Sequence, residues 1–330
     1  MCTKNLFKIT SFLQVDENGR PKQWFLNSPS YIEAQKYKPP HYSMQKIPCG
    51  QCFECNMEYA KPWAFRCMCE AKKYENNIMI NLTYDDENVP KGQKIDLKTG
   101  EVRESLTLKR KDQQDFIKRL RKHFSEQKIK IYLCGEYGSQ TKRPHYHILA
   151  FNLKIDDLKE IGRKNTEYGQ HIIYNSKTIE KIWGKGFVDL NEVNYETSCY
   201  VAGYVAKKAK HKKSDEWWEQ QGKIPEYTVS SKNFGKDYFE KNKDKFYEEK
   251  KIWQKTKKGL QEIKPGRYFD KLMEKDNPER FKQLKKLRRE RSKDILENIL
   301  NKTSLNKDEY MERKTIINEN KRKKMKRAFK

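Results

Sequence analysis

Two histidines and a preceding glutamate have the residue types and the spacing to bind a divalent cation. His145 and His147 lie two residues apart at the start of the apolar stretch 148–151, so on a strand both imidazoles project from one face. Two neutral imidazoles side by side can hold one metal ion. Glu136 lies near the end of the preceding strand, and a hairpin would bring its carboxylate beside them.

This set of three ligands leaves positions open for water and a phosphate oxygen, which suits Mg²⁺ or Mn²⁺ during phosphate chemistry. Taken singly, each residue has a simpler interpretation. A His-x-His pair can cap a strand end, and a glutamate can be an exposed acid of a hairpin. The three together are more specific than any one of them.

A second group of residues could supply a nucleophile. On a helix, residues four apart are neighbours, so Tyr200, Tyr204 and Lys208 share one stripe, and Lys207 lies on nearly the same side. A phenol with its ordinary pKa near 10 is a poor nucleophile at neutral pH, but an adjacent ammonium or metal ion favours the phenolate. Attack on a phosphodiester would leave a phosphotyrosine and a free 3′ hydroxyl. The alternative is a pair of packing tyrosines on a basic helix.

A third group is a cluster of cysteines. Cys49, Cys52 and Cys55 offer three thiolates at two-residue gaps, and Cys2, Cys67 or Cys69 could supply a fourth to complete a tetrahedral Zn²⁺ site. We take Cys2 as the fourth ligand of this structural zinc site. In a reducing cytoplasm, such crowding argues for metal rather than for disulfides, and the alternative is free thiols.

Charge points to a polyanionic partner. The 330 residues include 72 Lys and Arg against 46 Asp and Glu, a formal charge of +26, which would self-repel unless a polyanion is near. Nucleic acid is therefore the leading partner. There is no apolar run long enough to span a membrane, and residues 1–10 lack the apolar core of a signal peptide, so we expect a cytoplasmic protein without a membrane partner.

The apolar pattern predicts the elements that must position these groups. Strict alternation along 128–133 predicts a strand, which a short polar loop joins to the apolar strand at 148–151 as a hairpin. Other predicted elements are helix 63–74, strand 78–84, polar loop 91–103, basic helix 116–124, a helix ending at 183–184, strand 187–190 and helix 196–210. This order predicts an α+β fold with a central, largely antiparallel sheet flanked by helices.

The composition suggests three segments. Residues 1–60 are predicted to form an irregular N-terminal arm that carries the cysteine cluster, and residues 61–212 to form the folded core. Residues 213–330 are strongly charged, and we interpret them as a basic C-terminal extension that is helical or disordered.

Taken together, these motifs resemble the HUH endonuclease family. The segment from Pro144 to His147, preceded by Glu136 and followed by the stretch 200–208, is most similar to replication initiators of microviruses of the gokushovirus type. Residues 82–85 and 134–138 resemble that group's first and second motifs. Residues 48–55 with Trp63 and Arg66 resemble its amino-terminal region, and residues 264–268 are more faintly similar.

The resemblance implies a ferredoxin-like palm, with the histidine pair on a central strand and the tyrosine helix across from it. It implies that His145, His147 and Glu136 bind the metal and that Tyr200 and Tyr204 are nucleophiles. Some relatives carry lysine three positions after the first tyrosine, whereas this chain has Gly203 there. That departure favours Lys207 as the charge partner and leaves the order of the two tyrosines open.

The resulting hypothesis is a rolling-circle replication initiator of a bacterial phage. It would nick single-stranded or melted origin DNA, form a 5′-phosphotyrosine, transfer the strand later, and work with a host helicase and polymerase. The competing hypothesis is a non-catalytic protein that holds single-stranded nucleic acid by charge and stacking. A two-histidine phosphodiesterase is set aside because it would need a second His-x-Ser or His-x-Thr element, which the sequence lacks.

Overall fold

The computed structural model describes residues 5–27, 33, 35–50, 53–138, 140–166, 169–209, 215–248, 252–256, 259–263, 265–306, 309–310, 313–314 and 316–317. The chain forms two compact units, Tyr59–Lys285 and Met1–Glu58 together with Lys286–Lys330. Within the described residues, every helix is too short or too polar to cross a membrane.

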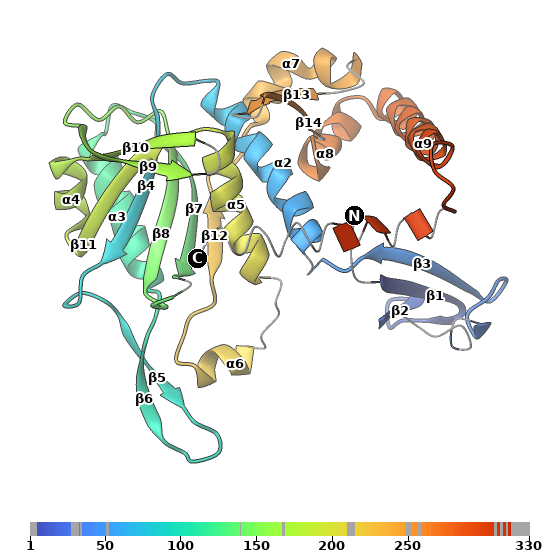
Figure 1. Cartoon of the computed structure of the whole chain (residues 1–330), viewed down its shortest axis with the longest axis horizontal. Coiled ribbons are helices and arrows are strands. Elements are labelled where there is room, and N and C mark those ends of the chain that lie inside the picture. The colour runs from blue at the N-terminus through green and yellow to red at the C-terminus, as the bar shows by residue number, and fades with distance from the viewer. Residues whose placement is uncertain are drawn as a thin grey trace. The chain divides into compact units, whose positions relative to one another are not determined.

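A seven-stranded antiparallel sheet organises the larger unit (Figure 1). Its strands, in spatial order, are β12 (Tyr227–Ser230), β7 (Lys130–Tyr137), β8 (Pro144–Phe151), β4 (Asn77–Tyr84), β11 (Gly186–Glu192), β10 (Gly169–Asn175) and β9 (Lys159–Thr166). Along the chain, β4, α3 (Arg110–His123), β7, β8, α4 (Lys177–Trp183) and β11 form a β-α-β-β-α-β unit whose strands have the ferredoxin-like spatial order. The predicted α+β fold with a central antiparallel sheet and flanking helices is confirmed.

Helices α3 and α4 cover one face of this sheet. Phe116 and Leu120, spaced by one helical turn on α3, are fully buried with Trp183 of α4. They pack on alternate strand residues, among them Ile80 and Ile148. Helix α4 begins at Ser176, whose hydroxyl accepts from the Ile179 amide, and ends at Gly184 in the left-handed conformation, so its termini follow ordinary capping rules.

Helices α2 (Phe53–Ala71) and α5 (Tyr195–Ala209) supply the cover for the opposite face. Val201 and Ala202 of α5 are fully buried in a second core together with Leu149 and Phe151 of β8. Tyr132, which alternation places on the face opposite Ile131, is 1% exposed because Trp63 stacks on it with ring centroids 5.0 Å apart. Both faces of β7 are therefore buried, although its sequence alternates.

A buried arginine ties the later part of the chain to α2. The Arg66 guanidinium lies 3.7 Å from the ring centroid of Tyr268 and 4.1 Å from that of Trp63, and it donates two hydrogen bonds to the Phe234 carbonyl. Gly266 has φ +82°, and a Cβ there would lie 2.5 Å from Pro62 Cβ, so only glycine fits. Trp63 and Arg66 thus pack with residues 266–268 of the fainter resembling segment.

Several elements that composition did not indicate complete the chain. In the smaller unit, the arm predicted to be irregular contains a three-stranded sheet in the order β2-β1-β3, formed by β1 (Asn5–Val15), β2 (Pro21–Asn27) and β3 (Tyr42–Pro48). In the larger unit, the predicted polar loop is the hairpin of β5 (Lys91–Ile95) and β6 (Val102–Leu106). Both expectations of irregular structure were wrong, because backbone pairing forms the three-stranded sheet around the buried Ile9 and the hairpin of β5 and β6, and composition alone did not indicate either.

The described residues from 215 to the end of the larger unit form helices and strands. It contains α6 (Asp215–Gln220), β12, α7 (Lys236–Glu248), the hairpin of β13 (Ile252–Thr256) and β14 (Gly259–Ile263), α8 (Arg267–Asp276) and the start of α9 (Pro278–Leu300). Phe239, Phe246 and Phe269 form a third core with Phe65 of α2. The division of the chain at residues 60 and 212 stays a prediction.

Candidate metal centre

The β7–β8 hairpin brings the three predicted metal ligands together. Glu136 pairs directly with His145, and alternation returns His147 to the same face two residues later. Glu136 Oε1 lies 3.2 Å from His145 Nε2 and 3.0 Å from His147 Nε2. The three ligand atoms lie within 4.8 Å of one another, so the group could hold a single cation.

The loop of this hairpin is shaped to leave room for His145. The Gly138 amide donates to the Arg143 carbonyl, and a Cβ at Gly138 would lie 3.1 Å from His145 Cε1, tighter than most real contacts. Arg143 in turn donates to the Tyr84 carbonyl and forms an ion pair with Asp86. The loop is therefore held against the end of β4 while the imidazole keeps its space.

The Glu-His-His group is largely buried, which makes an ionised carboxylate at Glu136 costly without a compensating charge. Glu136 is 2% exposed and His147 is 7% exposed, so the carboxylate has little access to water. An ionised carboxylate in such a place needs a compensating charge or hydrogen-bond donors. One carboxylate and two imidazoles fit a divalent cation, and the Glu-His-His group could therefore bind a metal ion.

A chain of side chains fixes the orientation of His147. Asn81 of β4 pairs with His147 on one side and with Asp189 of β11 on the other. The Asn81 amide nitrogen donates to the Asp189 carboxylate, which turns its amide oxygen toward His147 Nδ1. An Nδ1–H group that donates to this oxygen would leave the Nε2 lone pair for a cation at the centre. Asn191 also donates to Asp189, at 3.0 Å.

The sequence did not single out Asn81 or Asp189 as site residues. The available signal was a polar residue inside each strand, at a position that alternation directs to the face of the histidines. Only the pairing of β11 with β4, which are far apart in the chain, shows that the two side chains meet.

Helix α5 presents Tyr200 to the metal centre. The Tyr200 ring is 40% exposed and stands edge-on to the His147 ring, with centroids 5.4 Å apart. The buried neighbours Val201 and Ala202 fix the rotation of the helix. Helix α5 also includes the backbones of Tyr204, Lys207 and Lys208, whose side chains lie outside the described part of the chain.

Gly203, where some relatives carry lysine, faces α2. A Cβ at Gly203 would lie 3.8 Å from Ala60 Cβ, and both residues are buried. That separation is an ordinary van der Waals contact, so Gly203 lies where α5 packs against α2.

The Tyr146 side chain, between the two histidines, points to the opposite face of the sheet, as alternation predicts. Its hydroxyl donates to the Lys109 carbonyl at 2.9 Å and lies 2.9 Å from the Tyr84 hydroxyl, and its ring is fully buried. Burial raises the pKa of Tyr146 to about 12, so this phenol stays protonated at neutral pH. Tyr146 is a core residue.

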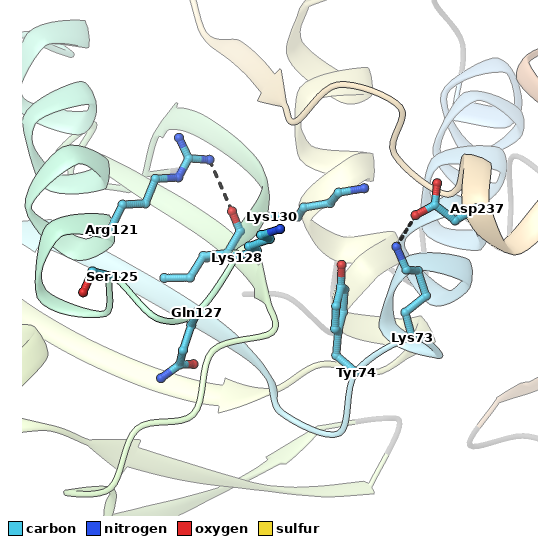
Figure 2. A pocket seen from close by; sticks show the side chains of 9 residues that line it. Lys73, Tyr74, Arg121, Ser125, Gln127, Lys128, Lys130 and Asp237 are labelled. Carbon is cyan, nitrogen blue, oxygen red and sulfur yellow. Dashed lines mark hydrogen bonds and ion pairs between the residues drawn. The ribbon is translucent and has the colours of Figure 1, made fainter.

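A hollow in the larger unit lies elsewhere (Figure 2). It has a volume of about 480 Å³ and is lined by residues that include Lys73, Arg121, Lys128 and Lys130. Lys130 begins β7 and Glu136 is six residues farther along, so the hollow is about 20 Å from the metal centre at the strand's rise per residue. The Lys73 charge is compensated by Asp237, as the dashed line in Figure 2 shows. The metal centre, near the end of β7 and the start of β8, is thus separate from this hollow.

The predicted zinc ligands are only partly described. Cys49 and Cys55 lie in the smaller unit with their Sγ atoms 4.0 Å apart, while Cys2 and Cys52 lie outside the described residues. Cys67 and Cys69 are fully buried in the cores of the larger unit, and burial raises the pKa of both thiols well above the ordinary value. Protonated, enclosed thiols are poor metal ligands.

The first prediction concerns the metal ligands themselves. His145→Ala and His147→Ala should each weaken Mn²⁺ binding by more than about 100-fold, because losing a ligand costs more than losing an outer-shell partner. Titration calorimetry with Mn²⁺ measures this, with His123→Ala as the control because that imidazole is exposed and remote in sequence. Equal Mn²⁺ affinity in all three variants would show that the group is not a metal site.

The second prediction concerns the support of His147. Asp189→Ala should weaken Mn²⁺ binding by about 10- to 100-fold, because Asn81 is then free to turn and His147 loses its fixed tautomer. Asp156→Ala is the matched control, since it removes an equal charge from a side chain that is 83% exposed. If the two aspartate variants bind Mn²⁺ alike, Asp189 has no positioning role.

Comparison with known proteins identifies the family. Residues 77–209 match the family of the replication-associated protein ORF2, a segment that begins with β4 and ends with α5. The chain is 34% identical over 239 residues to the replication-associated protein ORF2 of Spiroplasma virus 4, covering 71% of this chain and 70% of that protein.

Two further relatives agree with this match. The identity to the replication-associated protein VP4 of Bdellovibrio phage phiMH2K is 29% over 273 residues, 78% of this chain and 79% of that protein. To the replication-associated protein ORF4 of Chlamydia phage 1 it is 31% over 167 residues, 49% and 38% respectively. No solved structure matches the chain. The chain belongs to the family of microvirus-type phage replication-associated proteins.

Proposed function

We propose that the protein is a rolling-circle replication initiator that nicks single-stranded or melted origin DNA and stays bonded to it through a tyrosine. Membership in a family of phage replication-associated proteins supports the role in initiation. The observation that carries the chemistry is the contact between Tyr200 and His147, because it places a phenol beside a group that could hold a metal.

The triad would hold a divalent cation, Mg²⁺ or Mn²⁺, which polarises a phosphodiester and favours a nearby phenolate. Glu136 and the two histidines contribute the ligands and the shape of the site. Asn81 and Asp189 keep His147 in the tautomer that leaves Nε2 available. The partly exposed side of His145 is where DNA can approach.

The nicking step balances without a further reactant. Tyr200 Oη forms a bond to phosphorus as the bond from phosphorus to the 3′ oxygen breaks. The phenol proton is lost to solvent, and the leaving oxygen takes up a proton as a 3′ hydroxyl. The 5′ phosphate remains on the protein as a phosphotyrosine, which preserves the energy of the bond for later joining.

A second tyrosine suits a circular template. Tyr204 follows Tyr200 by one helical turn, a rise of about 6 Å, so both can serve one centre. One would stay bonded to DNA while the other attacks when the origin is regenerated. Lys207 and Lys208 remain the proposed charge partners, with Lys207 three positions after Tyr204 on nearly the same side of the helix.

The proposal also defines the partners. The excess of positive charge suits a phosphate backbone. The 3′ hydroxyl released by nicking is a primer end, so a host polymerase would extend it and a host helicase would open the duplex ahead.

The third prediction tests the covalent step. Labelled circular single-stranded DNA of the source phage, incubated with protein and Mn²⁺, should yield an adduct that survives denaturing electrophoresis. Tyr200→Phe and Tyr204→Phe should each retain some adduct, and the double variant should lose it, because the proposal allows either tyrosine to attack.

His147→Ala separates this proposal from a protein that only binds DNA. This variant should form no adduct yet keep salt-sensitive DNA binding, since the triad carries no positive patch. Absence of any adduct from the wild-type protein with melted origin DNA, despite tight binding, would instead support the non-catalytic function.

We also propose that Cys49 and Cys55 hold a structural Zn²⁺ in the smaller unit. A Zn–S bond of about 2.3 Å places two sulfurs of a tetrahedral site about 3.8 Å apart, close to the observed 4.0 Å. Cys2 and Cys52 remain the ligands expected from the sequence, and the burial of Cys67 and Cys69 favours Cys2 over either as the fourth. Such a site would close the end of the three-stranded sheet, because Pro48 at the end of β3 pairs with Asn5 of β1.

The fourth prediction measures this zinc. Protein purified without added metal should contain stoichiometric zinc by elemental mass spectrometry, and Cys49→Ser and Cys55→Ser should lose it because a three-sulfur site binds less tightly. Cys199→Ser, which removes a thiol from the larger unit, should retain the zinc. Zinc content that does not depend on Cys49 or Cys55 would refute the site.

A further inference from the structure

Phe187 stands exposed in the same cross-strand row as two of the metal ligands. It pairs with Thr83 of β4, Thr83 pairs with His145 of β8, and His145 pairs with Glu136 of β7. Directly paired residues of an antiparallel sheet point to the same face, so all four side chains lie on the metal-binding face. Phe187 is 67% exposed, whereas its neighbour Val188 is buried on the opposite face.

Close backbone contacts fix the place of this ring. Gly186 has φ +133°, and a Cβ there would lie 2.3 Å from the Asp85 amide nitrogen and 2.5 Å from the Thr83 carbonyl oxygen. The Trp183 indole also donates to the Thr83 carbonyl, at 3.1 Å. Phe187 is therefore presented by a rigid strand, at a defined position beside Thr83, rather than by a loop.

The distance to the metal centre suits a neighbouring nucleotide. Two strand spacings of about 4.8 Å separate Phe187 from His145, so their backbones are about 10 Å apart. Helix α5 contacts β7 and β8, and the face beyond them carries the partly exposed side chains of Asn81, Thr83 and Asp189. A strand whose phosphate lies at the centre can pass over this face and bring a base to the ring.

The side chains around Phe187 indicate which class of ligand binds to its ring. Among the described residues, the neighbours of Phe187 on this face of β4 and β11 are an amide, a hydroxyl and a carboxylate, so the ring lies among polar groups. A protein interface needs a contiguous apolar centre, whereas a nucleic-acid base can stack on one isolated ring. The charge of +26 favours the same polyanionic ligand.

We propose that Phe187 is a platform on which a base of the single-stranded DNA stacks beside the nick site. This inference rests on the proposed function, because it takes the metal centre as the place where the strand is cut. The role is one of positioning: stacking would hold the strand so that one particular phosphate lies at the centre.

The fifth prediction uses a fluorescein-labelled oligothymidylate and fluorescence anisotropy with the full chain. Phe187→Ala and Phe187→Leu should raise the Kd by about 5- to 150-fold, which corresponds to about 1–3 kcal/mol per stacked base, while Phe187→Tyr should stay near wild type. The dependence of the Kd on salt should not change, because no charge is removed. Phe25→Ala, which removes another ring that is 58% exposed, is the matched control.

The outcomes separate this inference from the nickase. Wild-type affinity in Phe187→Ala or Phe187→Leu would overturn the platform, as would an equal loss in Phe25→Ala. Unchanged Mn²⁺ affinity in Phe187→Leu shows that its DNA defect does not arise from a disturbed centre, and a matching loss of Mn²⁺ binding would count against stacking. If Phe187 governs binding but the wild-type protein forms no adduct, the nickase fails, and only the stacking contact stands, without a role in placing a phosphate for cutting. If the adduct forms and Phe187 has no effect on binding, only the platform fails.

Discussion

The register of β8 between β7 and β4 is the constraint on which the candidate site depends. It sets Glu136 opposite His145, and Asn81 opposite His147. A slip of one residue would send both imidazoles to the face of α3 and α4 and bring Tyr146 and Ile148 to the metal-binding face. The register is secured from both sides of the sheet, because Tyr146 and Ile148 are buried in one core and Leu149 in the other. The site is thus specified by the packing of residues that take no part in it.

The same strand also explains why polar groups can gather here. Along one face of β8, Phe151 and Leu149 are buried in the core with α2 and α5, whereas His147 and His145 lie beyond it toward the strand's start. His147 is still covered by Tyr200 of α5, so the change from apolar to polar side chains occurs beneath this helix. Burial of Glu136 lowers the polarity around the carboxylate while His145 keeps access to solvent. A cation bound there would relieve the cost of that burial, so metal binding and stability are coupled.

The sequence predicted the local structure of the site better than it predicted the residues that hold His147 in place. Alternation around Ile131 and the His-x-His spacing placed the hairpin and the three ligands, because these depend on neighbours within a few residues. Asn81 and Asp189 could not be paired in advance, since their contact depends on β11 lying beside β4 across more than a hundred residues. Alternation places Tyr132 on the same face as Lys128 and Lys130, which suggests exposure. Tyr132 is nevertheless buried, because Trp63, far away in the chain, stacks on it. The charged composition of the region after residue 212 gave no sign of β12, a strand of only four residues that depends on its pairing with β7.

Tyrosines near the centre show how environment, and not residue type, decides chemistry. Tyr146 is adjacent in sequence to both metal ligands, yet its hydroxyl is engaged with the Lys109 backbone and burial raises its pKa to about 12. Tyr200 is more than fifty residues away in the chain, yet its ring touches His147 and is partly exposed. The core that encloses Tyr146 leaves its hydroxyl no access to the face of the histidines. The rotation of α5, fixed by Val201 and Ala202, is what turns Tyr200 toward His147, and the proposed nucleophilic role depends on it.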